Sequence, residues 1–310
     1  MSGETNDPSI VLDHISHWYG PVIGLNDVSL RFEPGVTGLL GPNGAGKSTL
    51  MRLVTGQMAP SQGRVTVFGQ LPFANPAALM RLGHSPEHEE LYDHWSAREH
   101  LVALLRLGGF GRGDAKELAA AAITRVGLDH AADRRAGGYS KGMRQRLRIA
   151  QAIAHDPDLI VLDEPLNGLD PVGRREVIDL VRELGASGRT VVVSGHVLHE
   201  VEKMTRRIAL IYHGRVLAEG TIEEIRTALD QRPHHVRVAT SNPRALASLL
   251  LNEAGVVSVR VGNGEAQFEV TDPGPFFDQL GRIAAEGAIP VREFEATDDN
   301  LQSIFDYLVA

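Results

Sequence analysis

The chain has 310 residues, 43% of them hydrophobic and 23% charged, which predicts a soluble globular protein with room for more than one domain. A formal net charge of −8 disfavours a nucleic-acid backbone as the main partner, so we expect no nucleic acid among its ligands. The chain has no cysteine, which excludes disulfides and cysteine nucleophiles, and no apolar run approaches the ~18 residues of a membrane-spanning helix.

The first segments of the chain predict strands around an aromatic pair. The start, residues 1–8, is polar and acidic and unlike a secretory signal, which favours a cytoplasmic location. Residues 10–15 and 28–32 alternate as half-buried strands do. Between them lie Trp18 and Tyr19. Tyr19 either stacks on a nucleotide base or is an ordinary core or edge aromatic, and the sequence leaves both interpretations open.

The central motif is the phosphate-binding loop G-x-x-x-x-G-K-S at residues 41–48. A buried strand is predicted before it, at residues 36–40, and a helix after it, at residues 48–55, which is the context that this motif requires. Its glycines allow backbone N–H groups to surround phosphate oxygens, and the helix N-terminus adds partial positive charge. We expect Lys47 to reach the β- and γ-phosphates and Ser48 to hold Mg²⁺.

After this loop the sequence pattern changes from strand to helix. A strand is predicted at residues 63–69, and from about residue 75 to residue 154 the pattern is helical. Within this region Ser96 and Glu99 form a capping box, and Asp114 is expected to open a further helix. Glu87 lies in the turn that leads into the region, where a carboxylate is usually solvated.

A second candidate anion site lies near residue 140. Ser140 is a suitable N-cap, and the exposed N–H groups that follow it, together with the charge of Lys141, favour a bound anion. The helix predicted there carries Arg144, Arg146 and Arg148, which we expect on a solvated face rather than in a nucleic-acid patch.

Two carboxylates follow the next predicted strand. The apolar residues 159–162 predict a buried parallel strand, and Asp163 and Glu164 come directly after it, where ligands of such sheets lie. Asp163 is suited to Mg²⁺, through water, and Glu164 to accept the proton of an attacking water. The alternative is a structural role, in which both carboxylates cap the next turn.

The remaining segments of the first domain alternate between helices and strands. Asp170 is a good N-cap for a helix that runs to about residue 186. A buried strand at residues 190–194 leads to His196, which is either structural or directed at a γ-phosphate. Residues 208–219 predict a β-hairpin with His213-Gly214 at its turn.

The pattern breaks around residue 231, and a second domain is predicted over residues 232–310. Its elements occur in the order strand, helix, strand, strand, helix, strand, which is the ferredoxin-like arrangement. The predicted ranges are strands at 235–239, 256–261, 266–270 and 290–296 and helices at 243–254 and 275–286. A final helix would carry Leu301, Ile304, Phe305 and Leu308 on one face.

Taken in order, these motifs resemble the nucleotide-binding subunit of ATP-binding cassette (ABC) transporters over residues 9–231. GPNGAGKST resembles the Walker A motif, YSKGM the family signature, LIVLDEP the Walker B motif with its catalytic glutamate, and NGLD the D-loop. His196 resembles the switch histidine, and Glu87 stands where the family usually has glutamine. Lys141 replaces the first glycine of the signature. This variant signature, the Pro86-Glu87 dipeptide and the small C-terminal domain together resemble ABC-2 exporter ATPases.

The resemblance implies an α/β fold, with a P-loop NTPase (RecA-like) core, an inserted α-helical subdomain at about residues 75–154 and a small α+β ferredoxin-like C-terminal domain. It implies an ATPase with ATP and Mg²⁺ as its cofactors. The ATP-binding residues would be Tyr19, Gly41, Asn43, Gly44, Gly46, Lys47, Ser48, Thr49, Ser140 and Gly142. The catalytic residues would be Glu164 and His196, the metal site Ser48, Asp163 and Glu87, and the residue of dimer communication Asp170.

The same resemblance implies partners. Two chains would form a head-to-tail homodimer that ATP closes, and an integral membrane permease would hold the dimer on the inner face of the cell membrane. A soluble cassette ATPase that acts as an assembly factor is the alternative, and an importer ATPase is a third interpretation.

Overall fold

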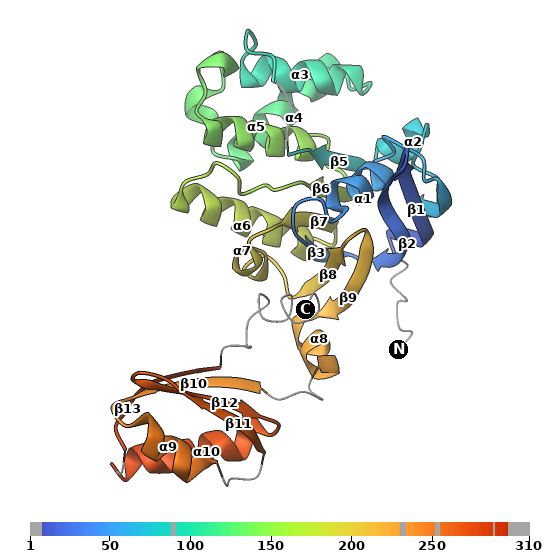
Figure 1. Cartoon of the computed structure of the whole chain (residues 1–310). Helices are drawn as coiled ribbons and strands as arrows, with labels where there is room; N and C mark the ends of the chain where they lie inside the picture. The colour runs from blue at the N-terminus through green and yellow to red at the C-terminus, as the bar shows by residue number, and fades with distance from the viewer. Residues whose placement is uncertain (1–7, 88–90, 230–233, 252–254, 288, 297–310) are drawn as a thin grey trace, which may run out of the picture. The chain divides into compact units, whose positions relative to one another are not determined.

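The chain divides into two compact units, Met1–Gly220 and Thr221–Ala310 (Figure 1). The computed structural model describes residues 8–87, 91–229, 234–251, 255–287 and 289–296. Among the described residues, no helix is both long and apolar enough to cross a membrane.

The first unit is built on a six-stranded sheet with the strand order β5-β6-β7-β3-β8-β9. Its strands are β3 (Gly35–Leu40), β5 (Leu82–Ser85), β6 (Leu159–Leu162), β7 (Thr190–Gly195), β8 (Arg207–Tyr212) and β9 (Arg215–Thr221). The first five strands in that order are parallel, so their carboxyl ends meet at one edge of the sheet. β6 and β7 are buried along their whole length, as the continuous apolar runs predict.

A second, antiparallel sheet packs in the same unit and has the order β2-β1-β4. Its strands are β1 (Ile10–Tyr19), β2 (Val22–Phe32) and β4 (Gln62–Val67). β1 and β2 are longer than the sequence predicts because irregularities interrupt their alternation, with His14 at φ 49° and Asp27 at φ 55°. The buried faces of β1, β2 and β4 form one core with the helix α1 (Lys47–Val54) and with β3.

Helices cover the parallel sheet and form a helical region beyond it (Figure 1). They are α2 (Pro76–Leu79), α3 (Ala97–Leu107), α4 (Arg112–Arg125), α5 (Lys141–Ile153), α6 (Pro171–Ala186) and α7 (Leu198–Glu202), with short 3₁₀ turns at Asp129–Ala131 and Ala136–Gly138. The capping box of Ser96 and the N-caps Ser140 and Asp170 are confirmed. The prediction that Asp114 opens a helix is wrong: α4 begins earlier, after Gly111, and has no side-chain cap.

The predicted helical stretch from residue 75 to residue 154 is interrupted by β5, the edge strand of the parallel sheet. β5 has only four residues and no β-branched side chain, so its sequence gives little strand signal. Gly83 is needed there because a Cβ at this position would lie 1.8 Å from the carbonyl oxygen of Ala152 on the neighbouring helical segment.

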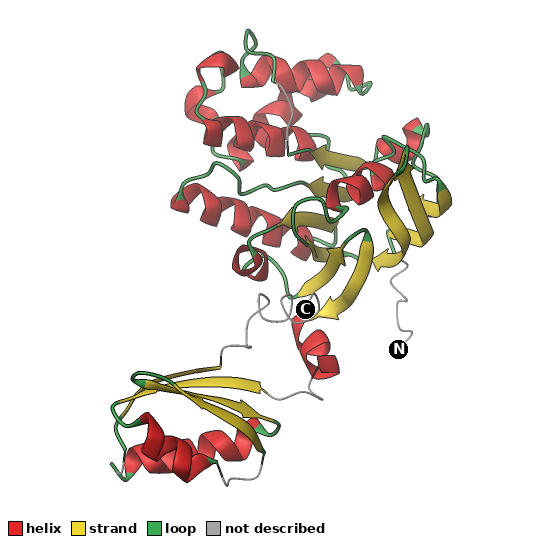
Figure 2. Ribbon diagram, viewed as in Figure 1, coloured by secondary structure: helices red, strands yellow, loops and turns green. Residues whose placement is uncertain are grey.

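The second unit contains α8 (Ile222–Leu229) and a four-stranded antiparallel sheet with two helices on one face (Figure 2). The other elements are β10 (His234–Thr240), α9 (Pro243–Leu250), β11 (Val256–Val261), β12 (Glu265–Val270), α10 (Pro273–Ala285) and β13 (Val291–Ala296). The strand order β11-β12-β10-β13 is ferredoxin-like, as predicted. The break expected near residue 231 and the final helix expected over residues 301–308 lie outside the described residues.

Candidate active site

The loop between β3 and α1 has a backbone that requires glycine. Gly41 and Gly46 have φ values of 154° and 113°, and a Cβ at Gly41 would lie 2.1 Å from the carbonyl oxygen of Ile211. The turn of the β8–β9 hairpin supports the loop, because the N–H of Gly214 donates to the carbonyl oxygen of Ala45 over 2.8 Å. The predicted hairpin therefore braces the phosphate loop, a contact that the sequence did not reveal.

Lys47 begins α1 and turns its side chain back over this loop. Its Nζ donates to the carbonyl oxygens of Gly41, at 2.6 Å, and Pro42, at 3.2 Å. Burial lowers the pKa of the Lys47 ammonium, and the charges of Glu164 and Asp163 oppose that shift. Lys47 is thus a buried cation between the loop and the two carboxylates.

The carboxylates at the end of β6 are held by a hydroxyl from the next strand. The Oγ of Ser194, on β7, donates to Oδ1 of Asp163 over 2.5 Å and accepts from the N–H of Glu164 over 2.8 Å. Ser48 donates to the other oxygen, Oδ2, of Asp163 over 3.3 Å. The prediction did not include Ser194. Its only sequence signal is a hydroxyl two residues before His196, at the end of a buried strand.

Glu164 and His196, the two residues predicted to be catalytic, contact each other. Nδ1 of His196 lies 2.9 Å from each carboxylate oxygen of Glu164. The Glu164 side chain is largely buried, whereas that of His196 is about half exposed, at 47%. Glu164 has a φ of 51°, a strained value for a residue with a side chain, and Gln145 donates to its carbonyl oxygen at 3.5 Å. The carboxylate is therefore held in a fixed direction by its backbone and by a histidine.

Tyr19 lies at the end of β1 beside the start of α1. Its hydroxyl donates to Oγ1 of Thr49 over 3.4 Å, and its ring lies against Gly24. Tyr19 is 40% exposed. Stacking of Tyr19 on a base stays a prediction.

Glu87 follows β5 at the same edge of the sheet. The backbone carbonyl oxygen of Glu87 accepts from Nη1 of Arg148 over 2.6 Å, and its carboxylate acts on the pKa of Lys47 in the same direction as Asp163. His84, within β5, is held by Gln57, whose Nε2 lies 3.2 Å from Nδ1 of the imidazole. Burial lowers the pKa of His84 to about 4, so the ring is neutral at pH 7.

The residues predicted for the second anion surface lie together around the N-termini of α5 and α6. The Oγ of Ser140 accepts from the N–H of Met143 over 3.2 Å, and Asp170 caps α6 through the N–H of Gly173 at 3.0 Å. The stem of Lys141 lies over Gly168, where a Cβ would approach it to 2.6 Å. Within the described part of the chain, no hydrogen bond joins Ser140 or Asp170 to the phosphate loop or to Glu164. The side chains of Ser140 and Asp170 are thus engaged at their own helix ends and not with the phosphate loop.

The expectation that the arginines of α5 lie on a solvated face is wrong. Arg144 pairs with Asp93, and Arg146 pairs with Glu176 over 2.5 Å. Arg148 donates to the backbone, as described above. The arginines thus tie α5 to α6 and to the loops that carry Glu87 and Asp93.

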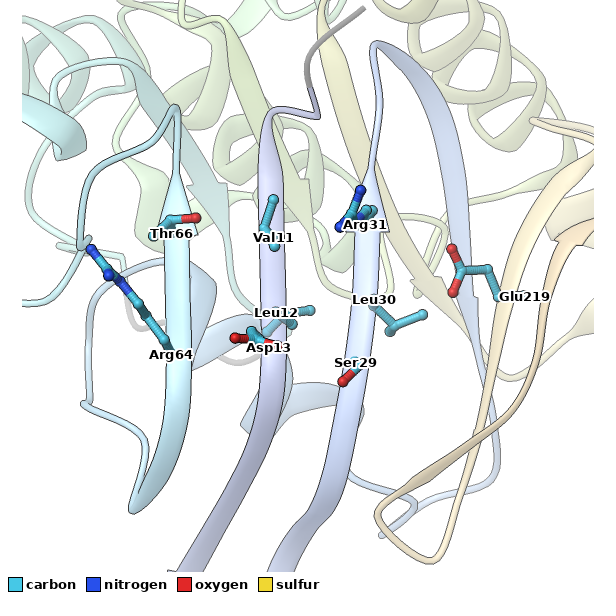
Figure 3. A pocket seen from close by; sticks show the side chains of 9 residues that line it. All are labelled: Val11, Leu12, Asp13, Ser29, Leu30, Arg31, Arg64, Thr66 and Glu219. Atoms are coloured by element: carbon cyan, nitrogen blue, oxygen red, sulfur yellow. The ribbon is translucent and has the colours of Figure 1, made fainter.

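A cavity of about 530 Å³ lies elsewhere in the first unit, across the antiparallel sheet and β9 (Figure 3). Arg31 and Arg64 line it together with Asp13 and Glu219, so its charges are of both signs. Burial raises the pKa of Glu219, and the charge of Arg207 opposes this. None of the predicted site residues lines this cavity, and it is distinct from the site at the phosphate loop.

Comparison with known proteins identifies the family. Residues 25–167 match the family described as "ABC transporter". The chain is 37% identical over 291 residues to the daunorubicin/doxorubicin resistance ATP-binding protein DrrA of Streptomyces peucetius. The alignment covers 93% of this chain and 88% of that protein. The chain belongs to the ABC transporter ATP-binding proteins. It is an ABC ATPase, and the resemblance found in its sequence motifs is confirmed.

Other relatives of this ABC ATPase agree with this assignment. It is 33% identical to the Nod factor export ATP-binding protein I of Sinorhizobium fredii (strain NBRC 101917 / NGR234), over 86% of this chain and 78% of that protein. A solved ATP-binding subunit of an ABC transporter superposes with a TM-score of 0.65 and 27% identity, over 71% of this chain and 92% of that chain. The ADP conformation of the cassette MJ1267 superposes with a TM-score of 0.61 and 26% identity, over 70% and 92% of the two chains. The fold is that of a P-loop cassette, and it binds nucleotide.

Proposed function

We propose that this ABC ATPase is the ATP-hydrolysing subunit of an exporter, in which it works as a head-to-tail homodimer on a membrane permease. The observation that carries the proposal is the Glu164–His196 pair beside the buried Lys47. This arrangement offers a proton acceptor, a cation and a phosphate loop at the carboxyl edge of one parallel sheet.

The residues of the site divide into three roles. Lys47 and the loop N–H groups bind the β- and γ-phosphates of ATP, and Tyr19 stacks on its base. Glu164 accepts the proton of the attacking water, and His196 holds its carboxylate in place. Asn43, Gly44 and Thr49 complete the ATP site from the exposed side of the loop.

The oxygens of Ser48, Asp163 and Glu87 fit a Mg²⁺ ion. Hydroxyl and carboxylate oxygens are the donors that Mg²⁺ prefers, and Ser48 and Asp163 already lie within hydrogen-bond distance of each other. Mg²⁺ supplies charge neutralisation at the β- and γ-phosphates when it is bound. The protein's own part is to hold Asp163 through Ser194.

The homodimer rests on the separation of the two surfaces. Ser140 and Gly142 lie at the exposed N-terminal end of α5, a suitable site for the γ-phosphate of ATP held by a second copy. Because one chain carries both surfaces, two identical chains provide two complete ATP sites. Gly168 and Leu169 lie against Gly142, and Asp170, which follows them and caps α6, serves communication between the copies.

The permease would dock at an apolar groove of about 270 Å³ between α2, β5, α3 and α5. Leu101, Leu104 and Phe110 line it, and His84 connects it to the edge that carries Asp163. Nearby, Tyr92 and Trp95 are exposed and stack at 4.8 Å, while Leu91 is buried. Export as the direction of transport is supported by relatives named for drug resistance and for Nod factor export. Such a partner would keep the chain on the inner face of the cell membrane.

The two parts of the chain would divide these tasks. Residues 9–231 act as the nucleotide-binding domain, with the helical subdomain at about 75–154, and residues 232–310 act as a small accessory domain. The accessory domain has its own core, which includes Phe268 and Phe276, so it can brace an assembly as a folded unit.

The test uses Glu164→Gln, which keeps the shape of the side chain and removes its proton acceptor. We expect this variant to bind ATP, to hydrolyse it poorly and to accumulate as a dimer in size-exclusion chromatography with ATP. Near-normal turnover would overturn the role of Glu164. The matched control is Glu117→Gln on the exposed face of α4. Glu176→Gln on α6 is unsuitable because it would break the ion pair with Arg146.

Purification of the tagged chain from membranes in mild detergent tests the partner. A stoichiometric polytopic membrane protein supports the transporter assignment. Recovery only with soluble partners would leave the ATPase chemistry unchanged and favour the assembly-factor alternative.

A further inference from the structure

The helix α6 is joined near its start to two other helices by ion pairs. Glu176 of α6 pairs with Arg146 of α5 over 2.5 Å, and Arg174 of α6 pairs with Glu200 of α7. α5 begins at the signature residue Ser140, and α7 begins two residues after His196. α6 therefore links the helix that follows the signature residue Ser140 to the helix that follows His196 in the same chain.

The link to α5 is enclosed on the side of Arg146, whereas the Glu176 side chain is 55% exposed. The Arg146 side chain is 18% exposed, and besides Glu176 it donates from Nη1 to the carbonyl oxygen of Val126 over 3.0 Å. The guanidinium also rests against the backbone of α6, because a Cβ on Gly173 would lie 2.9 Å from Nη2 of Arg146. Arg146 is thus fixed against the start of α6 from more than one side, and a shift of α5 would be transmitted to α6.

The link to α7 also includes the D-loop. Arg174 donates from Nε to the carbonyl oxygen of Leu169 over 3.2 Å, while its Nη1 donates to Glu200. The Glu200 side chain is only 15% exposed, although that of Arg174 is 45% exposed. The attraction between two charges is stronger in a partly buried ion pair than in an exposed one. Arg174 therefore couples the position of Leu169 to that of α7.

We propose that these two ion pairs form a relay that makes the two ATP sites of the dimer cooperative. The proposal rests on the head-to-tail dimer of the preceding section. There, each chain gives Ser140 to one ATP site and Glu164 to the other. The relay runs from Ser140 through Arg146–Glu176 and Arg174–Glu200 to His196, so closure at one site aligns the catalytic pair of the other. Arg174 and Glu200 are positioning residues in this scheme, because neither touches ATP.

The direct test breaks the second link and then rebuilds it. We expect Arg174→Met and Glu200→Gln each to keep the ATP affinity of wild type, measured with a fluorescent ATP analogue. Each should bring the Hill coefficient for ATP towards 1 and lower kcat about five-fold or more, within the ~100-fold that a misplacement of about 1 Å at a reacting group can cost. The charge swap R174E/E200R should recover part of both losses. It restores the ion pair but not the bond to Leu169.

The control lies on the same helix. Arg182 and Asp179 form an exposed pair within α6 at 3.9 Å and contact neither α5 nor α7 through it. Arg182→Met should leave kcat and the Hill coefficient unchanged. Arg146→Met should reproduce the loss of cooperativity seen in Arg174→Met, and combining the two variants should cost little more than either alone because they interrupt one path.

Two results would overturn the relay. One is a wild-type Hill coefficient of 1, because then there is no coupling to transmit. The other is a charge swap that performs no better than the single variants while its folding, followed by urea denaturation, matches theirs. Either result leaves the proposed function standing as long as Glu164→Gln still dimerises with ATP. Failure of that dimer would instead remove the basis of both proposals.

Discussion

The hydroxyl of Ser194 binds both Asp163 and Glu164 at the end of β6, so removing it perturbs both residues at once. Ser194→Ala removes the hydrogen bond to Oδ1 of Asp163 and leaves the N–H of Glu164 without its acceptor. A buried unpaired donor costs about 1–3 kcal/mol, and a lost bond to a charged group about 1.5–3 kcal/mol. Because Asp163 keeps its contact with Ser48, we expect a total loss of about 2–4 kcal/mol in the free energy of unfolding.

The same substitution should reduce the rate of ATP hydrolysis more than its cost in stability suggests. Ser194 fixes the backbone from which the Glu164 carboxylate points, and a misplacement of about 1 Å at a reacting group can cost ~100-fold in rate. We therefore expect kcat to fall by about 10- to 100-fold while ATP affinity changes little, because Lys47 and its loop are untouched. The assay is steady-state phosphate release at several ATP concentrations.

Thr190 provides the matched control at the opposite end of β7. It is as buried as Ser194, and its Oγ1 donates to Oγ of Ser9 over 2.7 Å, away from the site. Thr190→Val should lower the free energy of unfolding and leave kcat unchanged. If Ser194→Ala hydrolysed ATP as fast as Thr190→Val, the assignment of Ser194 as the support of Glu164 would be refuted.

Two further predictions concern charged groups of the first unit. Lys47→Met keeps the aliphatic stem but removes the ammonium, so ATP affinity should fall by about 10-fold or more, measured with a fluorescent ATP analogue, whereas Lys116→Met on the exposed face of α4 should match wild type. The pKa of His84 is about 4 in the folded chain against 6.5 when unfolded, so the unfolded chain takes up the proton first, and stability falls as the pH drops from about 6.5 to 4. Urea denaturation at pH 7 and pH 5 should show a loss of up to about 2 kcal/mol from this group that is absent in His84→Gln. An equal loss in that variant would contradict the buried, neutral state of His84.

Much of the site could be predicted from the sequence because its structure depends on residues that are close together in the chain. The phosphate loop needs glycines with positive φ next to a lysine, and both features are visible in residues 41–47. The caps Ser140 and Asp170 likewise depend on residues three positions apart, so short-range chemistry predicted them correctly. The hairpin turn at His213-Gly214 was predictable for the same reason.

The features that the sequence did not reveal depend on which strands and helices become neighbours. Ser194 reaches Asp163 only because β7 lies beside β6, and no pattern within either strand specifies that order. The arginines of α5 were expected in solvent because their partners, Asp93 and Glu176, lie on other elements. β5 was missed because four residues without β-branched side chains do not establish a period.

The left-handed backbone of Glu164 has a consequence for how this protein can be stabilised. A side chain at a φ of 51° costs of the order of 1–3 kcal/mol, which glycine would recover. A search for thermostable variants would therefore favour Glu164→Gly, and that variant would lose the proposed proton acceptor. Under the proposed mechanism, greater thermal tolerance and turnover are opposed at this one position.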